Sequence, residues 1–367
     1  MNKLVINNLL HRPLRTAISV FAVAIEVVMI LSIVAIMFGM LNDQKTRQSG
    51  IGADMIVRPA NASFMTGVSG APAPIKVADV LRKVPHVAVV APVITNLTTG
   101  GSVETIWGID YESYNGLKPF TFVSGGPFQG ADDVIIDDYF ARADKGHQVG
   151  DTIKILNHDF RICGIVEHGK GGRKFLRIDT MGSLIGAEGH ASLFYLKSDN
   201  IANQEVIRNE IKAVPGMSDY LVQTMDEWLS LMTPAHLPAF TAALNTVIII
   251  AVIVGFLVIF QSMYTAVMER TREIGILKSL GASKGYIVNV VLRETMLLSV
   301  AGVVLGIVFT LGLRAFMAYR SPTFSFQLTW EWMIRGALIA FVGAFLGAVY
   351  PALKAARKDP IDALAYE

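Results

Sequence analysis

The sequence predicts a membrane protein with four transmembrane α-helices and a large α+β extracytoplasmic domain between helices 1 and 2. Apolar residues make up 52% of the 367 residues, charged residues only 17%, and the mean hydropathy is +0.47. Soluble domains carry about 25% charged residues, so the apolar surplus points to segments inside a bilayer. Four such segments are present, and residues 42–238, between the first two, have an ordinary soluble composition.

The first apolar segment comprises residues 18–41 and is interrupted only by Glu26. A helix needs about 20 mostly apolar residues to cross the hydrocarbon layer. The alternative is a secretory signal, whose apolar core has about 7–15 residues before a cleavage site. Because this segment is about twice as long as such a core, we expect it to remain attached as transmembrane helix 1.

Three further segments predict helices 2 to 4. Residues 239–268, 295–313 and 336–353 contain no charge, and the last two are rich in glycine and alanine. At about 1.5 Å per residue, helix 2 is roughly 45 Å long, whereas the hydrocarbon layer is about 30 Å thick. We therefore expect its outer end to project from the bilayer as a rigid stalk. Residues 314–335 are the short outer loop before helix 4.

The positions of basic residues predict the orientation of the chain. Eleven Lys and Arg residues lie before helix 1, in the loop 269–294 and in the tail 354–367, against three in residues 314–335. Basic residues in short loops concentrate on the cytoplasmic side of a membrane. Both termini and the loop 269–294 are therefore expected in the cytoplasm, and residues 42–238 outside it.

The outer domain is predicted to be a mixed α+β fold. Segments such as VETIWGID and DTIKILN alternate in the manner of strands and are separated by Gly and Asp turns, and a helix is expected at about residues 203–214. The aspartate pairs at 132–133 and 137–138 are predicted to lie in solvated turns. The basic, glycine-rich residues 167–175 are predicted to form a mobile hairpin tip.

The sequence contains no catalytic motif and no metal-ligand motif that we can identify. HExxH, CxxC and GxxxxGK[ST] are all absent, and the seven histidines are dispersed. The single cysteine, Cys163, excludes an internal disulfide and is expected to be a buried thiol in an apolar strand. A net charge of +2 is too small to indicate a nucleic-acid partner. We therefore expect no catalytic residues, no metal site and no nucleic acid.

The loop after helix 2 carries an amphipathic pattern. Its first residues, ERTREIGILKSLGAS, combine charged side chains with apolar positions, and Gly281 suits a helix C-terminus. This pattern predicts a short helix at the cytoplasmic membrane surface. Its simplest role is to cap the helix bundle.

Three segments carry a family resemblance. ERTREIGILKSLGAS (269–283) resembles the signature after the second membrane helix of FtsX/MacB-type ABC transporter permeases, and the tail YPALKAARKDPIDALAYE resembles the end of these proteins. The opening NNLLHRPLRTAISV resembles their N-terminal interfacial helix, here placed at residues 1–17. The segments GADMIVR and VGDTIKI...FRICGIVEHG are similar to their periplasmic core domain, here residues 42–238.

The resemblance implies a non-catalytic permease subunit in the bacterial inner membrane. Its partners would be a separate cytoplasmic ABC ATPase that holds ATP and Mg, a second permease copy of the same or another kind, membrane lipids and, in some members, a membrane-fusion protein. In this family the short cytoplasmic helix is the coupling helix that docks on the ATPase. The matching positions are Glu269, Arg270, Arg272, Glu273, Gly275, Lys278 and Gly281.

Two features inside the apolar segments call for separate hypotheses. Gly302 and Gly306 in helix 3, and Gly343 and Gly347 in helix 4, each form a GxxxG that allows close helix contact, either between helices 3 and 4 or at a dimer seam. Glu26 departs from the family pattern, which is ordinarily apolar there. It either pairs with a basic group near the cytoplasmic boundary or faces a second Glu26 across a dimer and holds a polar or cationic substrate group.

The resemblance allows two functions. The first is ATP-driven export or extraction of a hydrophobic or amphipathic molecule, such as a lipid, lipoprotein or drug-like compound, by mechanotransmission to the periplasmic domain. The alternative is a signalling scaffold that activates a periplasmic cell-wall hydrolase without transport. A full-size outer domain favours the first function, because the hydrolase-activating members tend to have a smaller one.

Overall fold

The computed structural model describes residues 13–60, 73–98, 104–143, 146–233, 236, 238–320 and 325–358. The chain divides into two compact units. The helical unit contains the chain up to Met40 and most of the chain from Pro238 onward, and the sheet domain contains Leu41–Leu237 with the short piece Arg320–Thr323. The predicted N-terminal interfacial helix at residues 1–17 falls largely outside the described residues.

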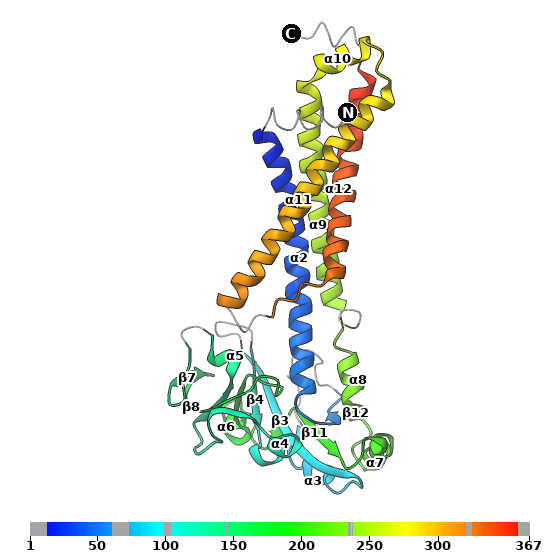
Figure 1. Cartoon of the computed structure of the whole chain (residues 1–367). Coiled ribbons are helices and arrows are strands. Elements are labelled where there is room, and N and C mark those ends of the chain that lie inside the picture. The colour runs from blue at the N-terminus through cyan, green and yellow to red at the C-terminus, as the bar shows by residue number, and fades with distance from the viewer. Residues whose placement is uncertain are drawn as a thin grey trace. The chain divides into compact units, whose positions relative to one another are not determined.

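Among the described residues, the helical unit comprises four long helices and one short one (Figure 1). Their bounds are α2 (Pro13–Ser49), α9 (Pro238–Glu269), α10 (Thr271–Ser279), α11 (Lys284–Arg320) and α12 (Trp330–Arg357). The four long helices are each long and apolar enough to cross a membrane. Together with the sheet domain between α2 and α9, they confirm the predicted fold class.

The long helices exceed the apolar segments from which they were predicted. Helix 3 was expected at residues 295–313, but α11 begins at Lys284 and ends at Arg320 and so takes residues from both flanking loops. Helix 1 was expected to end at residue 41, but α2 continues to Ser49. Hydropathy marks only the part of a helix that lipid or protein covers, whereas the helical hydrogen bonds continue through the polar residues on either side.

Glycines bring the long helices of this unit together in two pairs. A Cβ atom added to Gly302 or Gly306 of α11 would lie 2.5 or 2.8 Å from the Cβ atom of Val23 or Val27 of α2. A Cβ atom on Gly347 of α12 would lie 2.8 Å from the Phe256 carbonyl oxygen of α9. The pairing of helix 3 with helix 4 through these motifs was therefore wrong, because the motifs place helix 3 on helix 1 and helix 4 on helix 2 within one chain.

The sheet domain is a mixed sheet of ten described strands with short helices between them. The strand order is β12-β1-β11-β3-β4-β9-β6-β8-β5, and β7 pairs with β8. Neighbours are antiparallel except β4 with β9 and β6 with β8, which are parallel. The bounds are β1 (Met55–Arg58), β3 (Val87–Thr98), β4 (Glu104–Ile109), β5 (Phe122–Gly125), β6 (Asp133–Asp137), β7 (Thr152–Ile155), β8 (His158–Val166), β9 (Lys174–Arg177), β11 (Leu193–Ser198) and β12 (Leu221–Thr224).

The remaining elements of this domain are short. A separate two-stranded sheet joins β2 (Ala73–Pro74) to β10 (His190–Ala191). The helices are α3 (Val77–Leu81), α4 (Tyr111–Leu117), α5 (Asp138–Ala141), α6 (Ile178–Leu184), η1 (Ile201–Asn203), α7 (Gln204–Ala213) and α8 (Met225–Ser230). The amphipathic α7 lies where the sequence predicted a helix, and it buries Ile207 and Ile211.

An aromatic cluster fills one part of the domain core. Trp107 stacks on Tyr195 with ring centroids 6.0 Å apart, and Tyr114 and Phe175 meet the Trp107 ring edge-on. Gly171 approaches the same indole so closely that an added Cβ atom would lie 2.7 Å from it, and its φ of +84° also favours glycine. The loop that carries Gly171 is thus fixed against the core.

Cys163 lies in β8 and is 9% exposed. Its Sγ atom donates a hydrogen bond to the Val134 carbonyl oxygen at 3.4 Å. Burial, followed by the nearby charge of Asp133, raises the pKa of the thiol to about 12. The thiol therefore stays protonated and unreactive at physiological pH, as expected for a buried cysteine.

Candidate functional site

The predicted coupling residues lie on and beside α10, the short helix between α9 and α11 (Figure 1). Thr271, Ile274 and Gly275 are buried and form the inner face of α10. The chain then turns at Gly281, whose φ of +94° is typical of the residue that follows a helix C-terminus. These residues position the helix.

Arg270, at the start of α10, is held inside the helical unit. Its Nη1 atom donates to Oε2 of Glu294 in α11 at 3.0 Å, and Arg15 of α2 donates to Oε1 of the same carboxylate at 3.0 Å. Glu294 is only 3% exposed, and Glu269 at the end of α9 lies 3.7 Å from Arg15. We call Arg15, Glu269, Arg270 and Glu294 the helix-end cluster, because they join the ends of α2 and α9 to α11.

Lys278 is also engaged within the chain. Its Nζ atom donates to the Ala356 carbonyl oxygen at 3.0 Å and to the Lys358 carbonyl oxygen. These carbonyls belong to the last turn of α12 and the residue after it, where a helix leaves acceptors unpaired. Lys278 therefore fixes α10 to the end of α12.

The outward face of α10 is exposed to solvent. Arg272 and Glu273 are exposed, and so are Ile276 and Leu280, with exposed fractions of 44% and 79%. Ile276 and Leu280 are four residues apart, so their side chains lie on the same side of the helix. The structure thus divides the seven predicted residues into an inner set that holds α10 and an outer set, Arg272 and Glu273, that accompanies an apolar pair.

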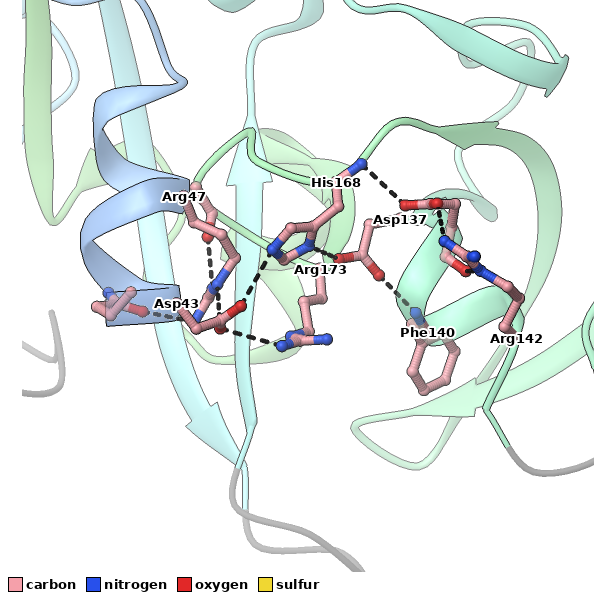
Figure 2. Close-up of polar contacts among 10 residues, drawn as sticks. Asp43, Arg47, Asp137, Phe140, Arg142, His168 and Arg173 are labelled. Atoms are coloured by element: carbon pink, nitrogen blue, oxygen red, sulfur yellow. Dashed lines mark hydrogen bonds and ion pairs between the residues drawn. The ribbon is translucent and has the colours of Figure 1, made fainter. Parts of the chain in front are cut away.

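A second cluster lies in the sheet domain, where the last turns of α2 meet the loop between β8 and β9. Figure 2 shows His168 between two carboxylates: its Nε2 atom lies 3.1 Å from Asp43 and its Nδ1 atom 2.7 Å from Asp137. Arg173 donates to Asp43 at 3.0 Å, and Arg47 donates to Asp43 at 3.0 Å and to the Gly171 carbonyl oxygen at 2.6 Å. We call these residues the His168 cluster.

Neighbouring groups complete the His168 cluster. The Tyr139 ring stacks on the imidazole with centroids 4.1 Å apart, and the His168 backbone N–H donates to Asp138 at 2.9 Å. Gln48, one residue beyond Arg47, accepts a hydrogen bond from Tyr195 in the domain core at 2.7 Å. Three side chains on the last turns of α2 are therefore fixed within the sheet domain.

The electrostatics of the His168 cluster favour its charged forms. Burial alone would lower the pKa of His168, but the hydrogen bonds and charges of Asp137 and Asp43 raise it above its ordinary value. Burial would raise the pKa of Asp43, but the hydrogen bond from His168 and the charges of Arg47 and Arg173 hold it well below its usual range. The protonated imidazole and the surrounding carboxylates therefore stabilise each other.

Two expectations for this region were wrong, the first of them in part. Asp132 is exposed in a turn as expected, but Asp133 and Asp137 are 2% and 1% exposed, because Asp133 accepts hydrogen bonds from backbone N–H groups and Arg161 while Asp137 caps α5 and binds His168. Residues 167–175 are not a mobile tip, since Lys170 is buried and Gly171 packs on the core. Sequence reasoning missed Glu294, Asp43 and His168, because no local motif marks a charge whose partners are distant in sequence.

Glu26 lies in the middle of the helical unit. It is 3% exposed, and neither carboxylate oxygen has a hydrogen-bond partner among the described residues. The expected pairing with a basic group is thus not found there. Burial within one chain also disagrees with a face that meets a second Glu26 across a dimer.

No group of three or more His, Cys, Asp or Glu side chains in the described ranges could hold a metal ion. What these sites can do is hold helices together and present one charged and apolar helix face.

Comparisons with known proteins agree with this architecture. Residues 16–214 match the MacB-like periplasmic core domain, and residues 245–360 match the FtsX-like permease C-terminal family. The uncharacterized ABC transporter permease YknZ from Bacillus subtilis (strain 168) is 30% identical over an aligned region that covers 61% of this chain and 58% of YknZ. The macrolide export ATP-binding/permease protein MacB from Acinetobacter baylyi is 25% identical over an aligned region that covers 97% of this chain and 58% of that MacB.

Solved structures also match the chain. The periplasmic region of MacB from Actinobacillus actinomycetemcomitans is 18% identical, with a TM-score of 0.39, and the match covers 49% of this chain and 92% of that one. The chain spans less than two thirds of the length of the curated relatives named above.

Proposed function

The chain belongs to the FtsX/MacB-type family of ABC transporter permeases, and on this premise we propose that it is the membrane subunit of an ATP-driven complex that exports or extracts a hydrophobic or amphipathic substrate. In this proposal the ATPase is a separate subunit that holds ATP and Mg. Two permease copies span the bacterial inner membrane with both termini in the cytoplasm and the sheet domain in the periplasm.

The outward face of α10 is the observation that carries the proposal. An exposed Ile276–Leu280 pair beside Arg272 and Glu273 offers apolar area flanked by both signs of charge. Interfaces bury such apolar anchors at their centre and keep charges at the rim. Because Arg270 and Lys278 fix α10 to α11 and α12, a force on this face moves those helices with it.

The transmitting element in this proposal is α2. It is one helix of 37 residues from Pro13 to Ser49, so it is about 55 Å long. Arg15 near its start belongs to the helix-end cluster, and Asp43 and Arg47 near its end belong to the His168 cluster. An α-helix cannot lengthen without breaking backbone hydrogen bonds, so a displacement at one end reaches the other end.

The test is a charge exchange on the α10 face. The chain is co-purified with its partner ATPase in lipid bilayers, and ATP turnover is measured with added lipids, lipoproteins or drug-like compounds. We expect Arg272→Glu combined with Glu273→Arg to weaken association at least about tenfold and to abolish substrate-stimulated turnover, since misplaced charges at an interface cost several kcal/mol.

The matched control exchanges an exposed ion pair elsewhere on the helical unit. Glu331 and Arg335 near the start of α12 form such a pair, whereas Lys278 binds the opposite end of that helix. The exchange Glu331→Arg with Arg335→Glu should leave turnover unchanged. Equal effects of the two exchanges would refute the docking role of α10. ATP turnover that activates a cell-wall hydrolase and moves no substrate would refute transport.

A further inference from the structure

Glu26 occupies a notch made by glycine. A Cβ atom added to Gly255 of α9 would lie 1.9 Å from Oε2 of Glu26, so the carboxyl group packs directly against this glycine and would have to move for any larger residue. Gly343 of α12 lies on the other side, where an added Cβ atom would be 3.5 Å from Oε1. The carboxyl group of α2 is thus enclosed by α9 and α12, with 3% of the residue exposed.

No charge of the surrounding helices faces this carboxyl group. Apart from Glu26, residues 16–41, 239–268, 295–313 and 336–353 contain no Asp, Glu, Lys, Arg or His, and their only tyrosines are Tyr264 and Tyr350. These tyrosines lie nine and seven residues from Gly255 and Gly343, which is about 10 Å or more along the helix axes. The nearest charged residues along the four helices are Arg15, Asp43, Glu269, Glu294, Arg314, Arg335 and Lys354.

A carboxylate cannot remain ionised in such a place without a partner. Burial of an unpaired charge in an apolar medium is far more costly than burial of the neutral acid, so the group takes up a proton instead. Both oxygens lack a hydrogen-bond partner among the described residues, so no side chain there compensates a negative charge. The ligand that fits this notch is a proton.

We propose that Glu26 is a proton-binding site whose occupancy depends on the packing of α2 against α9 and α12. The carboxyl group holds its proton while the three helices are packed, and it releases the proton to water and becomes a carboxylate when they separate. By linkage, acid favours the packed arrangement and alkali favours the separated one. Any helix movement driven by a partner would then carry a proton step with it.

Infrared spectroscopy of the full chain in an alkyl-glycoside detergent, which has no carbonyl group of its own, tests the proton directly and needs no ATPase. Near neutral pH we expect the C=O stretch of a protonated carboxylic acid in the wild-type protein and its loss in Glu26→Gln. Glu26→Asp should retain the band at a shifted frequency, which covers the case in which the Gln variant does not fold. Absence of the band in the wild-type protein, or its persistence in Glu26→Gln, would overturn the proposal.

The glycine notch provides an independent test. Gly255→Ala should lower the thermal stability of the purified chain, whereas Gly343→Ala should change it little, because 3.5 Å is an ordinary contact distance. In a Glu26→Ala background the added methyl group meets no carboxyl group, so Gly255→Ala should no longer be harmful. An equal loss in both backgrounds would show that the carboxyl group does not occupy the notch. Neither test depends on the transport proposal, so each can fail independently of it.

Discussion

Glu26 and Glu294 are equally buried, at 3% exposure each, yet their surroundings are opposite. Glu294 receives hydrogen bonds from Arg15 and Arg270 at 3.0 Å each. Glu26 meets two glycines and has no partner among the described residues. The first carboxylate joins helix ends through ion pairs, and the second is accommodated only as a neutral acid.

The comparison teaches that burial alone does not tell what a carboxyl group does. A buried ion pair contributes little by its presence but costs much when one partner is removed. A protonated carboxyl group in a fitted notch can be replaced by an amide of the same shape at small cost. The two residues should therefore respond very differently to the same substitution.

The largest expected loss of stability comes from the substitution Glu294→Gln. Removing this charge leaves two largely buried guanidinium groups without the carboxylate they share, and we expect a loss of about 3–5 kcal/mol in stability. The midpoint of thermal aggregation of the purified chain measures this loss. Glu26→Gln is the matched comparison and should lose little. Losses of similar size would remove the distinction between the two carboxyl groups.

A smaller effect is expected from Lys278→Met. This substitution keeps the apolar stem but removes the donor to the carbonyl oxygens of Ala356 and Lys358, at a cost of about 1–2 kcal/mol. Amide hydrogen exchange should quicken in residues 354–358 and in α10. Lys284→Met, at the exposed first position of α11, is the control and should leave exchange unchanged. Unchanged exchange in Lys278→Met would show that α10 is held by other contacts.

The smallest effect concerns the His168 cluster, which extends the comparison to a fully paired histidine. Because the pKa of His168 is raised in the folded protein, His168 contributes its full stabilisation below its ordinary pKa of about 6.5. This stabilisation is lost as the pH rises through the pKa of His168 in the folded state. Because the pKa of Asp43 is lowered in the folded protein, Asp43 contributes its full stabilisation above its ordinary pKa of about 3.9. This stabilisation is lost as the pH falls through the pKa of Asp43 in the folded state. The cluster should therefore be strongest between these limits.

Amide exchange in residues 168–173 measures this pH dependence. We expect the wild-type protein to lose protection in this segment as the pH rises, and His168→Gln no longer to show this loss. His158→Gln is the control, because His158 forms an exposed pair with Asp132. The proposed role of His168 would be contradicted by an alkaline limb of the same size in the His168 variant.

Sequence reasoning identified the parts of the fold that follow from local composition. Runs of apolar residues predict the long helices, and alternation predicts the strands, because lipid and core burial act on each segment separately. The helices α2 and α11 are longer than predicted, because polar residues can continue a helix beyond its apolar segment.

The candidate sites could be predicted only in part. The family signature located α10, but it did not separate Arg270 and Lys278, which face inward, from Arg272 and Glu273, which face out. That separation depends on Glu294 and on the end of α12, and both are distant from α10 in sequence. The notch at Gly255 was likewise invisible, because it exists only where two helices meet.

The inert thiol of Cys163 has a practical consequence for the study of this protein. It is the only cysteine in the sequence and lies 9% exposed beneath the surface of the sheet domain. Maleimide and spin-label reagents react with thiolates, which this residue does not form at neutral pH. Fluorophores or spin probes attached to a cysteine introduced on α10 can therefore report motion in the otherwise native chain, with no need for a cysteine-free background.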